Sequence, residues 1–271
     1  MEVAGQNVVV TGGAGGIGRA LVRRFAQEGA RAVVVADRDV EGAQSIAGEV
    51  GGLAVELDAG REDSVRALIA EASAAYGPID IFISNAGVPG AGGGPEAADD
   101  AWDEAWRVNV MAHVWAARAL LPEMVARGEG YLINTASAAG LLTQVSSLVY
   151  SVTKHAAVSL AEWLAIEYAE KGVRISCICP QGVRTPMLEL AMDDPAGSAA
   201  LLSGGLIEPE DVADAVIAGI REERMLILPH ENVAGFMALK GADPERWLKG
   251  MRRLVRQART EKPSSPSVEP G

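Results

Sequence analysis

Short apolar runs alternate with longer amphipathic segments along most of the chain. The runs are continuously apolar and too short for helices, which is typical of strands buried on both faces. They lie at residues 7–12, 30–37, 52–58, 79–87, 130–137, 172–180 and 225–229. Because such alternation builds a parallel sheet with helical crossovers, we predict an α/β fold, a doubly wound parallel sheet of about seven strands with helices on both faces.

Amphipathic segments fill the intervals, with apolar residues recurring every three to four positions as on one face of a helix. They lie at residues 16–29, 40–50, 64–77, 99–126, 150–171 and 209–223. No internal repeat or domain-scale linker interrupts the pattern, so we expect a single domain spanning residues 1–259.

The end of the chain departs from this alternation. Residues 186–208 mix apolar residues with chain breakers, so we expect a mobile lid there. Residues 244–259 have apolar side chains at helical spacing with arginines between them, which predicts a docked C-terminal helix, with a subunit contact as the alternative. Residues 260–271 are rich in proline and serine and have little to bury, so we expect a disordered tail.

The balance of charges limits the kind of partner. The 271 residues carry a formal net charge of -12, and the sequence pI is about 4.8. Nucleic acids and anionic membrane surfaces attract basic proteins, so we expect neither as the main partner and favour a small molecule. The sequence has no basic leader and no apolar stretch of about 20 residues, so we expect a cytoplasmic location.

Cysteine and histidine residues give no sign of a metal site. Cys177 and Cys179 are two positions apart in a predicted strand, so both point to the same face and are expected to be reduced core thiols. His113, His155 and His230 are scattered without the spacing of metal ligands. We therefore predict no bound metal.

The segment "VVVTGGAGGIGRAL" combines a strand, a glycine cluster and the start of a helix, where backbone N–H groups can bind a pyrophosphate. The motif G-x-G-x-x-G starts at Gly13, and the motif T-G-x-x-x-G-x-G starts at Thr11, and spacing alone leaves both registers open. Either register predicts dinucleotide binding, since glycine lets the backbone approach a phosphate closely. The candidate loop contacts are Gly12, Gly16, Ile17 and Gly18.

Acidic residues at two strand ends indicate which dinucleotide binds. Asp37 ends the second predicted strand, about 20 residues beyond the last loop glycine, where a carboxylate accepts hydrogen bonds from the adenosine ribose. The same carboxylate repels a 2′-phosphate, so NAD is favoured and NADP is the less favoured cofactor. Arg38 follows directly and is the residue that would hold a phosphate. Asp58 ends the third strand and is expected near the adenine, with a plain strand-end carboxylate as the alternative.

Several motifs occur in a defined order along the chain. They are the glycine loop, "SNAG" at residues 84–87, Asn109 in "RVNVMAHV", Ser137 in "NTASAAG", "YSVTK" at residues 150–154 and "PQGVRTPM" at residues 180–187. Together they resemble the short-chain dehydrogenase/reductase family, in the branch built as a single Rossmann domain, and the resemblance runs from Asn7 to Pro229. It implies hydride transfer between a nicotinamide and an alcohol or carbonyl. Two departures are Gln181, where the family commonly has glycine, and the long C-terminal helix, where many relatives have a glycine-rich end.

Tyr150 and Lys154 stand one helical turn apart and share one face of the predicted helix. Hydride transfer to a carbonyl leaves negative charge on oxygen, so a group must donate a proton, and in the oxidative direction the same group must remove one. Lowering the pKa of a phenol from about 10 to about 7 takes roughly 4 kcal/mol, which a cation supplies only in a partly dry cleft. We therefore predict Tyr150 as the general acid/base, its pKa lowered by Lys154 and the oxidised nicotinamide, with an ordinary amphipathic helix turn as the alternative.

Two residues complete the predicted catalytic set. Ser137 ends a predicted strand, at the sheet edge where α/β folds bind their ligands, and is expected to hydrogen-bond the substrate oxygen. By resemblance, Lys154 also binds the nicotinamide ribose, and Asn109 holds a water that continues the proton path from the lysine.

Four residues are expected on the nicotinamide side of the cofactor. Val183 and Thr185 are predicted to contact the carboxamide through backbone groups and a hydroxyl, with a plain loop as the alternative. Asn85 and Gly87 follow the fourth predicted strand and are expected to shape the floor of the cofactor site, with a simple turn as the alternative.

The candidate substrate contacts are largely apolar, which favours a hydrophobic secondary alcohol or ketone. They are Val88, Leu141, Leu142, Val145, Leu148, Met187, Leu188, Leu190 and Met192. Gln144 is a candidate polar contact, with an exposed loop residue as the alternative, and for Arg184 a surface role is favoured over contact with a substrate carboxylate. By resemblance, we expect a homodimer or homotetramer joined through the two long helices.

Two other functions remain open from the sequence. An NAD-binding sensor or scaffold without turnover would have no need of the catalytic residue types. A reductase of carrier-linked acyl groups would have a basic patch near the mouth of its site, which the acidic composition disfavours.

Overall fold

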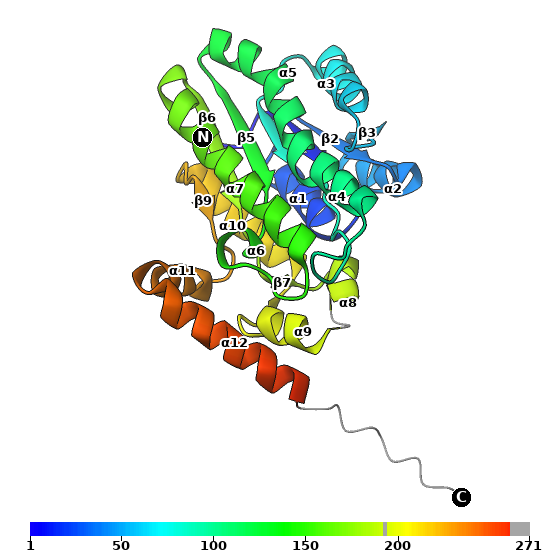
Figure 1. Ribbon diagram of the computed structural model, residues 1–271. Helices are drawn as coiled ribbons and strands as arrows, with labels where there is room; N and C mark the ends of the chain where they lie inside the picture. The colour runs from blue at the N-terminus through cyan, green and yellow to red at the C-terminus, as the bar shows by residue number, and fades with distance from the viewer. Residues whose placement is uncertain (192–193, 261–271) are drawn as a thin grey trace, which may run out of the picture.

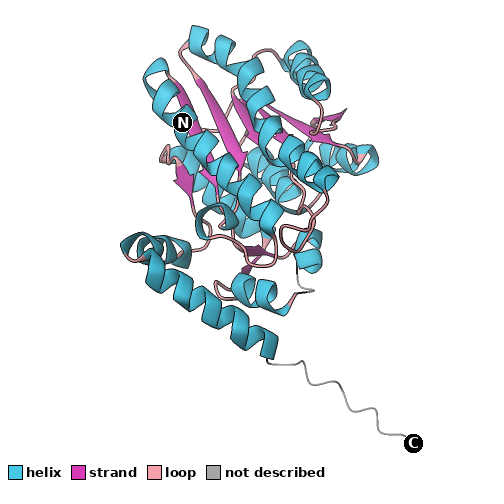
Figure 2. Ribbon diagram, viewed as in Figure 1, coloured by secondary structure: helices cyan, strands magenta, loops and turns pink. Residues whose placement is uncertain are grey.

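The computed structural model describes residues 1–191 and 194–260. Within these residues, seven parallel strands form one sheet in the order β3-β2-β1-β4-β5-β6-β9 (Figures 1 and 2). The strands are β1 Asn7–Thr11, β2 Ala32–Asp37, β3 Leu53–Glu56, β4 Ile81–Ser84, β5 Gly130–Thr135, β6 Val173–Ile178 and β9 Leu226–Ile227. The prediction of a doubly wound α/β fold with about seven strands is confirmed.

The sheet is apolar on both faces because helices cover both (Figure 2). Successive residues of β1 show this alternation, since Val9 packs into one core while Val8 and Val10 pack into the other. One face is covered by α1 Gly16–Gln27, α2 Val40–Val50 and α10 Pro209–Arg221, and the other by α3 Glu62–Tyr76, α5 Ala112–Arg127 and α7 Leu148–Tyr168. The strand order reverses beside β1, so the carboxyl ends of β1 and β4 border the ligand crevice of this fold.

The long helix expected at residues 99–126 is three segments in the structure. Helix α4 Asp99–Trp106 leads into a π-helical turn, η1 Arg107–Met111, and then into α5. Asn109 lies in this π turn, which widens the helix at that point. A shorter 3-10 turn, η2 Ala169–Lys171, extends α7.

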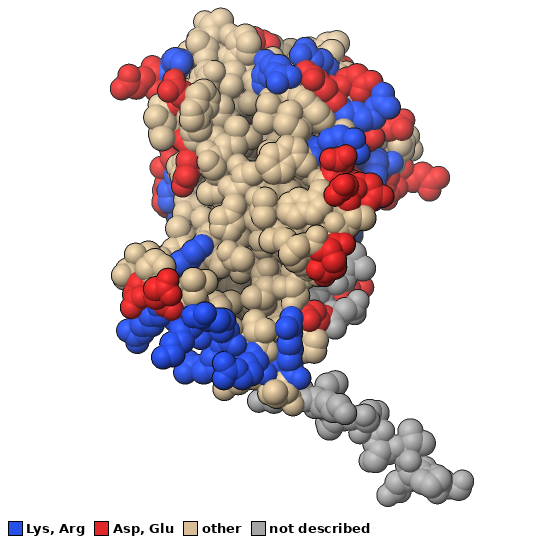
Figure 3. Space-filling model, in the orientation of Figure 1, with Lys and Arg blue, Asp and Glu red and all other residues tan. Residues whose placement is uncertain are grey.

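The C-terminal part contains elements that bridge the carboxyl edge of the sheet. They are α6 Ala139–Leu142, β7 Gly182–Val183 paired with β8 Leu206–Ile207, α8 Pro186–Ala191, α9 Pro195–Leu202, α11 Asn232–Ala242 and α12 Pro244–Thr260. Helix α11 was not predicted. Helix α12 packs against α9 and α11 and carries many of the Lys and Arg side chains visible at the lower edge of Figure 3.

The predicted tail begins one residue too early, because Thr260 is the last residue of α12. The rest of that tail, residues 261–271, lies outside the described residues. No helix within the described residues is both long enough and apolar enough to span a membrane.

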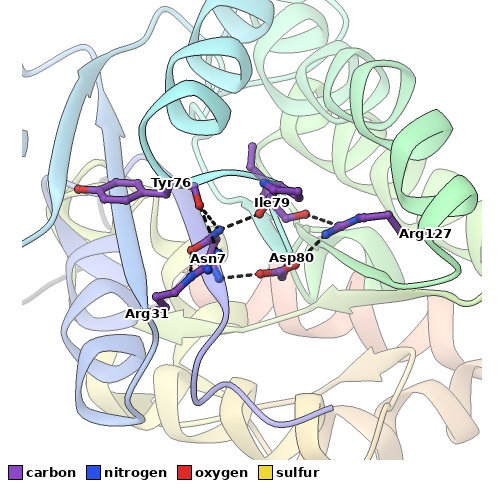
Figure 4. Close-up of polar contacts among 7 residues, drawn as sticks. Asn7, Arg31, Tyr76, Ile79, Asp80 and Arg127 are labelled. Atoms are coloured by element: carbon purple, nitrogen blue, oxygen red, sulfur yellow. Dashed lines mark hydrogen bonds and ion pairs between the residues drawn. The ribbon is translucent and has the colours of Figure 1, made fainter.

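A polar cluster ties the amino ends of β1 and β4 together, at the edge of the sheet opposite the glycine loop (Figure 4). The Asn7 side chain donates to the carbonyl oxygens of Tyr76 and Pro78, each at 2.8 Å, and accepts from Arg31. Arg127 pairs with Asp80 at 2.9 Å. Because these groups satisfy one another, the cluster is a structural clamp.

Candidate active site

The glycine loop connects β1 to α1, and its geometry distinguishes between the two registers. Gly12 and Gly16 have positive φ angles of 67° and 49°, and a Cβ on Gly18 would overlap the carbonyl oxygen of Gly12. Gly15 has neither property. The backbone therefore needs glycine at the positions of the motif that starts at Thr11.

Thr11 and Asn85 join the glycine loop to the end of β4. The Thr11 hydroxyl accepts hydrogen bonds from the backbone N–H groups of Asn85 and Ala86, at 2.9 and 3.0 Å. The Asn85 side chain donates to the Thr11 carbonyl at 3.0 Å. Thr11 and Asn85 thus fix the glycine loop to the segment that follows β4. This role of Thr11 was not predicted from the sequence.

Asp37 at the end of β2 lies against the glycine loop. Its carboxylate accepts a hydrogen bond from the backbone N–H of Ala14 at 3.0 Å and another from Asp39. Arg38 and Asp58 are exposed, and the Asp58 carboxylate accepts from the N–H of Gly60. The acidic end of β2 is therefore set directly beside the loop.

Lys154 is buried, and its ammonium group lies between strand β5 and Tyr150. Its Nζ atom donates to the Thr135 carbonyl at 2.9 Å and lies 5.6 Å from the centroid of the Tyr150 ring. A Cβ on Gly87 would lie only 3.4 Å from this Nζ atom and 3.3 Å from Asn109 Oδ1. Glycine at position 87 therefore leaves room for the lysine.

Asn109 clamps the segment that follows β4. Its Nδ2 atom donates to the carbonyl of Val88 at 2.9 Å and to Thr153 Oγ1 at 3.2 Å, and its Oδ1 atom accepts from the Val88 N–H. Each polar atom of the fully buried side chain thereby has a partner, and Oδ1 can accept one further hydrogen bond. It holds the segment of Gly87 and Val88 in place.

Ser137 follows β5 and is also buried. Its hydroxyl accepts from the N–H of Ala139 at 3.1 Å and donates to the Pro180 carbonyl at 3.3 Å. The Ser137 hydroxyl also lowers the pKa of Tyr150, which acts against the larger effect of burial. Ser137 and Tyr150 are therefore close neighbours although they lie on different elements.

Burial sets the pKa of both members of the Tyr150–Lys154 pair. The pKa of Lys154 is lowered to about 8, chiefly because its ammonium group is withdrawn from water. The pKa of Tyr150 is raised, again chiefly by burial. Among the protein groups, burial therefore outweighs the effect of Ser137. The lowering expected from the sequence includes the positive charge of the oxidised nicotinamide and stays a prediction.

The segment of Gln181 crosses the cleft opposite the glycine loop. The Gln181 N–H donates to His230 Nδ1 at 3.1 Å, and the other ring nitrogen of His230 donates to the Gly182 carbonyl. The Gln181 side chain donates to the Ala200 carbonyl in α9 at 2.9 Å. Gln181 has no positive φ, so the backbone accommodates a side chain at this position.

Thr185 lies across from the glycine loop, since its methyl group would be 3.1 Å from a Cβ on Gly16. Its hydroxyl donates to the Val183 carbonyl at 3.4 Å.

One cleft of about 1810 Å³ joins these groups. All of the predicted catalytic and cofactor residues line it except Asn109, which stands behind Gly87. A cradle that extends from a glycine loop and a strand-end carboxylate to a buried lysine fits an extended dinucleotide.

The predicted substrate contacts are only partly brought together. Val88, Gln144, Val145, Met187 and Leu188 line the cleft. Leu142 lines a neighbouring cavity, while Leu141 and Leu148 line neither. The side chains of Leu190 and Met192 lie outside the described part of the chain. Arg184 pairs with Glu208 on the surface.

A doubly wound sheet with such a cleft defines a nucleotide-binding oxidoreductase of the single-domain kind. The family model of the short chain dehydrogenases matches residues 6–196. The chain belongs to the short-chain dehydrogenase/reductase family and is an enzyme that acts on CH–OH groups.

Relatives and solved structures agree with this membership. The chain is 35% identical over 225 residues to a 2,5-dichloro-2,5-cyclohexadiene-1,4-diol dehydrogenase of Sphingobium indicum, covering 80% of this chain and 90% of the relative. It is 38% identical over 229 residues to a 4-formylbenzenesulfonate dehydrogenase of Comamonas testosteroni, with the same coverage. A short chain dehydrogenase/reductase from Burkholderia phymatum in complex with NAD matches with a TM-score of 0.82 and 29% identity, over 90% of this chain and 96% of that one.

Proposed function

We propose that this enzyme interconverts a hydrophobic secondary alcohol and its ketone with NAD as the cofactor. The observation that carries the proposal is the single cleft, which joins the glycine loop to Tyr150, Lys154 and Ser137. A protein that only senses or stores NAD would have no need of a proton-transferring group at that place.

The cofactor would lie along the cleft in a fixed direction. The N-terminus of α1 and the loop glycines would hold the pyrophosphate, and Asp37 would hold the adenosine ribose. Asn85, Gly87, Val183, Thr185 and Lys154 would surround the nicotinamide half, which supplies or accepts the hydride when bound. The Asp37 carboxylate favours NAD over NADP, because a 2′-phosphate would meet its negative charge.

The protein residues move and hold the proton. Burial keeps the Tyr150 phenol protonated at neutral pH, so it is ready to donate to a carbonyl oxygen. Ser137 would hydrogen-bond the same oxygen. Lys154 holds its proton below about pH 8 and would bind the nicotinamide ribose. Asn109 would hold a water that leads the proton path to solvent.

The substrate side of the cleft is largely apolar. Val88, Val145, Met187 and Leu188 line it, which favours a hydrophobic alcohol or ketone. Two relatives are named for a cyclic diol and for an aromatic aldehyde bearing a sulfonate, both ring compounds. We propose that residues 186–208, with α8 and α9, close over this side as a lid.

Replacement of Tyr150 tests the proposal. We expect Tyr150→Phe to lower turnover by roughly 10²–10⁴-fold in a screen of secondary alcohols and ketones followed by NADH absorbance. NADH affinity should stay within about twofold, because the cofactor contacts remain. Tyr168→Phe is the matched control, since Tyr168 packs edge-on against Trp163 at the end of α7. Unchanged turnover in Tyr150→Phe would refute the assignment.

We also propose that the enzyme is a cytoplasmic homodimer or homotetramer. The middle of the face in Figure 3, where Figure 1 places α7, is almost free of charged side chains. Trp163 and Ile166 on α7 are 56% and 78% exposed, which is costly for an isolated subunit. Sedimentation should show an oligomer at micromolar concentration that Ile166→Glu dissociates, and a monomeric wild type would reject this proposal.

A further inference from the structure

Helix α12 has a charge opposite to that of the whole protein. It contains six basic residues and one acidic residue, Glu245, whereas the complete chain has a net charge of -12. The basic residues are Arg246, Lys249, Arg252, Arg253, Arg256 and Arg259. Figure 3 shows this concentration of positive charge beside a hollow in the surface.

Four of these cations form one stripe along the helix. Arg246, Lys249, Arg253 and Arg256 follow one another at intervals of three or four positions, so they point the same way. All four are exposed, and none of them forms an ion pair within residues 1–191 and 194–260. The stripe is therefore available to an anion.

The stripe borders a second cavity, of about 830 Å³, between α6, α9, α11 and α12. The apolar part of its lining includes Leu142, Leu201, Phe236, Trp247, Met251 and Leu254. No Asp or Glu among the described residues lines it. The cavity thus combines an apolar interior with a cationic rim.

This cavity adjoins the catalytic cleft. Ser137, Gln144, Gln181 and Leu201 line both spaces. Ser137 is the residue expected to hydrogen-bond the reacting oxygen, so the two spaces meet at the place where that oxygen would lie. The apolar walls of the second cavity suit a ring or a chain.

We propose that the cavity beside α12 is a substrate subsite for amphipathic alcohols and ketones that carry an anionic group. The carbon that reacts would lie at Ser137 and Tyr150, the apolar body would fill the cavity, and a carboxylate or sulfonate would meet Arg246, Lys249, Arg253 and Arg256. This inference rests on the proposed function for the position of the reacting carbon.

A small molecule explains these features better than a macromolecule does. The cations border a cavity that leads to Ser137, whereas a membrane or an acidic carrier protein would need a broad cationic face. The remaining surface is strongly acidic and would repel such partners. A small anion meets only the local field of the stripe, because salt screens charges beyond about 8–10 Å.

Matched fluorescent probes test the subsite without any turnover. The probes are 1-anilinonaphthalene-8-sulfonate and N-phenyl-1-naphthylamine, which share a ring system and differ in the sulfonate. In the presence of saturating NAD, the double variant Arg246→Gln/Arg253→Gln should bind the sulfonate about tenfold more weakly, while the affinity for the neutral probe changes less than about twofold. Arg252→Gln is the matched control, because Arg252 is on the same helix and does not line the cavity.

Equal affinity of the sulfonate probe for wild type and double variant would overturn the proposal. The wild type could instead bind phosphatidylcholine–phosphatidylglycerol vesicles, with the double variant losing this binding and keeping its sulfonate affinity. That result would also overturn the proposal and assign the stripe to a membrane surface.

In kinetics, wild type should prefer 4-acetylbenzoate over its methyl ester, and the double variant should lose the preference. If neither ketone reacts, the probe result alone decides. Failure of the proposed function is separate, because it is measured as unchanged turnover in Tyr150→Phe.

Discussion

Lys154 Nζ is hydrogen-bonded to the Thr135 carbonyl at 2.9 Å, so strand β5 holds the ammonium group behind the Tyr150 ring. The same burial that places Lys154 there lowers its pKa to about 8. Burial raises the pKa of Tyr150. The two groups therefore titrate in an order that makes the lysine the first to lose its proton as the pH rises.

The rate of ketone reduction should fall as the pH rises through about 8. Lys154 then loses the charge that we propose binds the cofactor ribose, while Tyr150 still carries its proton. Lys154→Arg keeps a positive charge, since guanidinium has a pKa above about 12. A profile of kcat/KM between about pH 6 and 10 should show the alkaline fall in wild type and not in Lys154→Arg. The same fall in both proteins would assign it to another group.

Gly18→Ala should weaken NADH binding by at least about tenfold, because the new Cβ would overlap the Gly12 carbonyl, which is backbone and cannot move aside. Gly15→Ala is the matched control, since its Cβ would meet no atom within 4 Å. NADH fluorescence titration measures both affinities, and thermal melting confirms that both variants are folded. Gly18 belongs to both registers, so Gly15→Ala decides between them: an affinity as low as that of Gly18→Ala would contradict the register that starts at Thr11.

The strands and the glycine loop could be predicted because their signals are local. Continuous runs such as Val8–Val10 fit only buried strands. The order of the motifs along the chain was enough to predict that Ser137 and Tyr150 share one site. Helix α11 was missed because Gly235 and Gly241 weaken its helical signal, while contacts with α6 and α12 stabilise it. The π turn at Asn109 depends on one extra residue per turn, which no periodicity of side chains reveals.

Properties that depend on burial or on spatial grouping were harder to predict. The raised pKa of Tyr150 follows from desolvation, which exceeds the effect of any neighbouring charge. The basic stripe of α12 was hidden by the net charge, which averages over the complete chain. The acidic composition argued against a basic patch near the site, yet one borders the adjoining cavity.

Asp37→Ser should shift the cofactor preference toward NADPH. The change removes a carboxylate that would repel a 2′-phosphate, so the ratio of kcat/KM for NADPH over NADH should rise at least about tenfold. Glu56→Gln is the matched control, because Glu56 on β3 is the register partner of Asp37 on β2 but does not line the cleft. A ratio that changes equally in both variants would mean that Asp37 acts only through the general charge of the surface.

His113 should make the folded enzyme sensitive to acid. It lies one turn after Asn109 and is buried, and neither ring nitrogen has a hydrogen-bond partner among the described residues. Burial, together with the charge of Lys154, lowers the pKa of His113 to about 3. A folded-state pKa below the ordinary value of 6.5 means that the unfolded chain binds the proton first, so stability falls as the pH falls through 6.5 toward 3.

The slope approaches roughly 1.36 kcal/mol per pH unit below pH 6.5, so wild type should lose about 2 kcal/mol between pH 8 and 5 from this group alone. His113→Leu should be spared this loss, because leucine takes up no proton and leaves no unsatisfied polar atom in the core. Urea unfolding of both proteins at pH 5 measures the difference, and unfolding at pH 8, where His113 is neutral in both states, is the reference. Parallel losses in the two proteins would show that the pKa of His113 is not lowered in the folded protein.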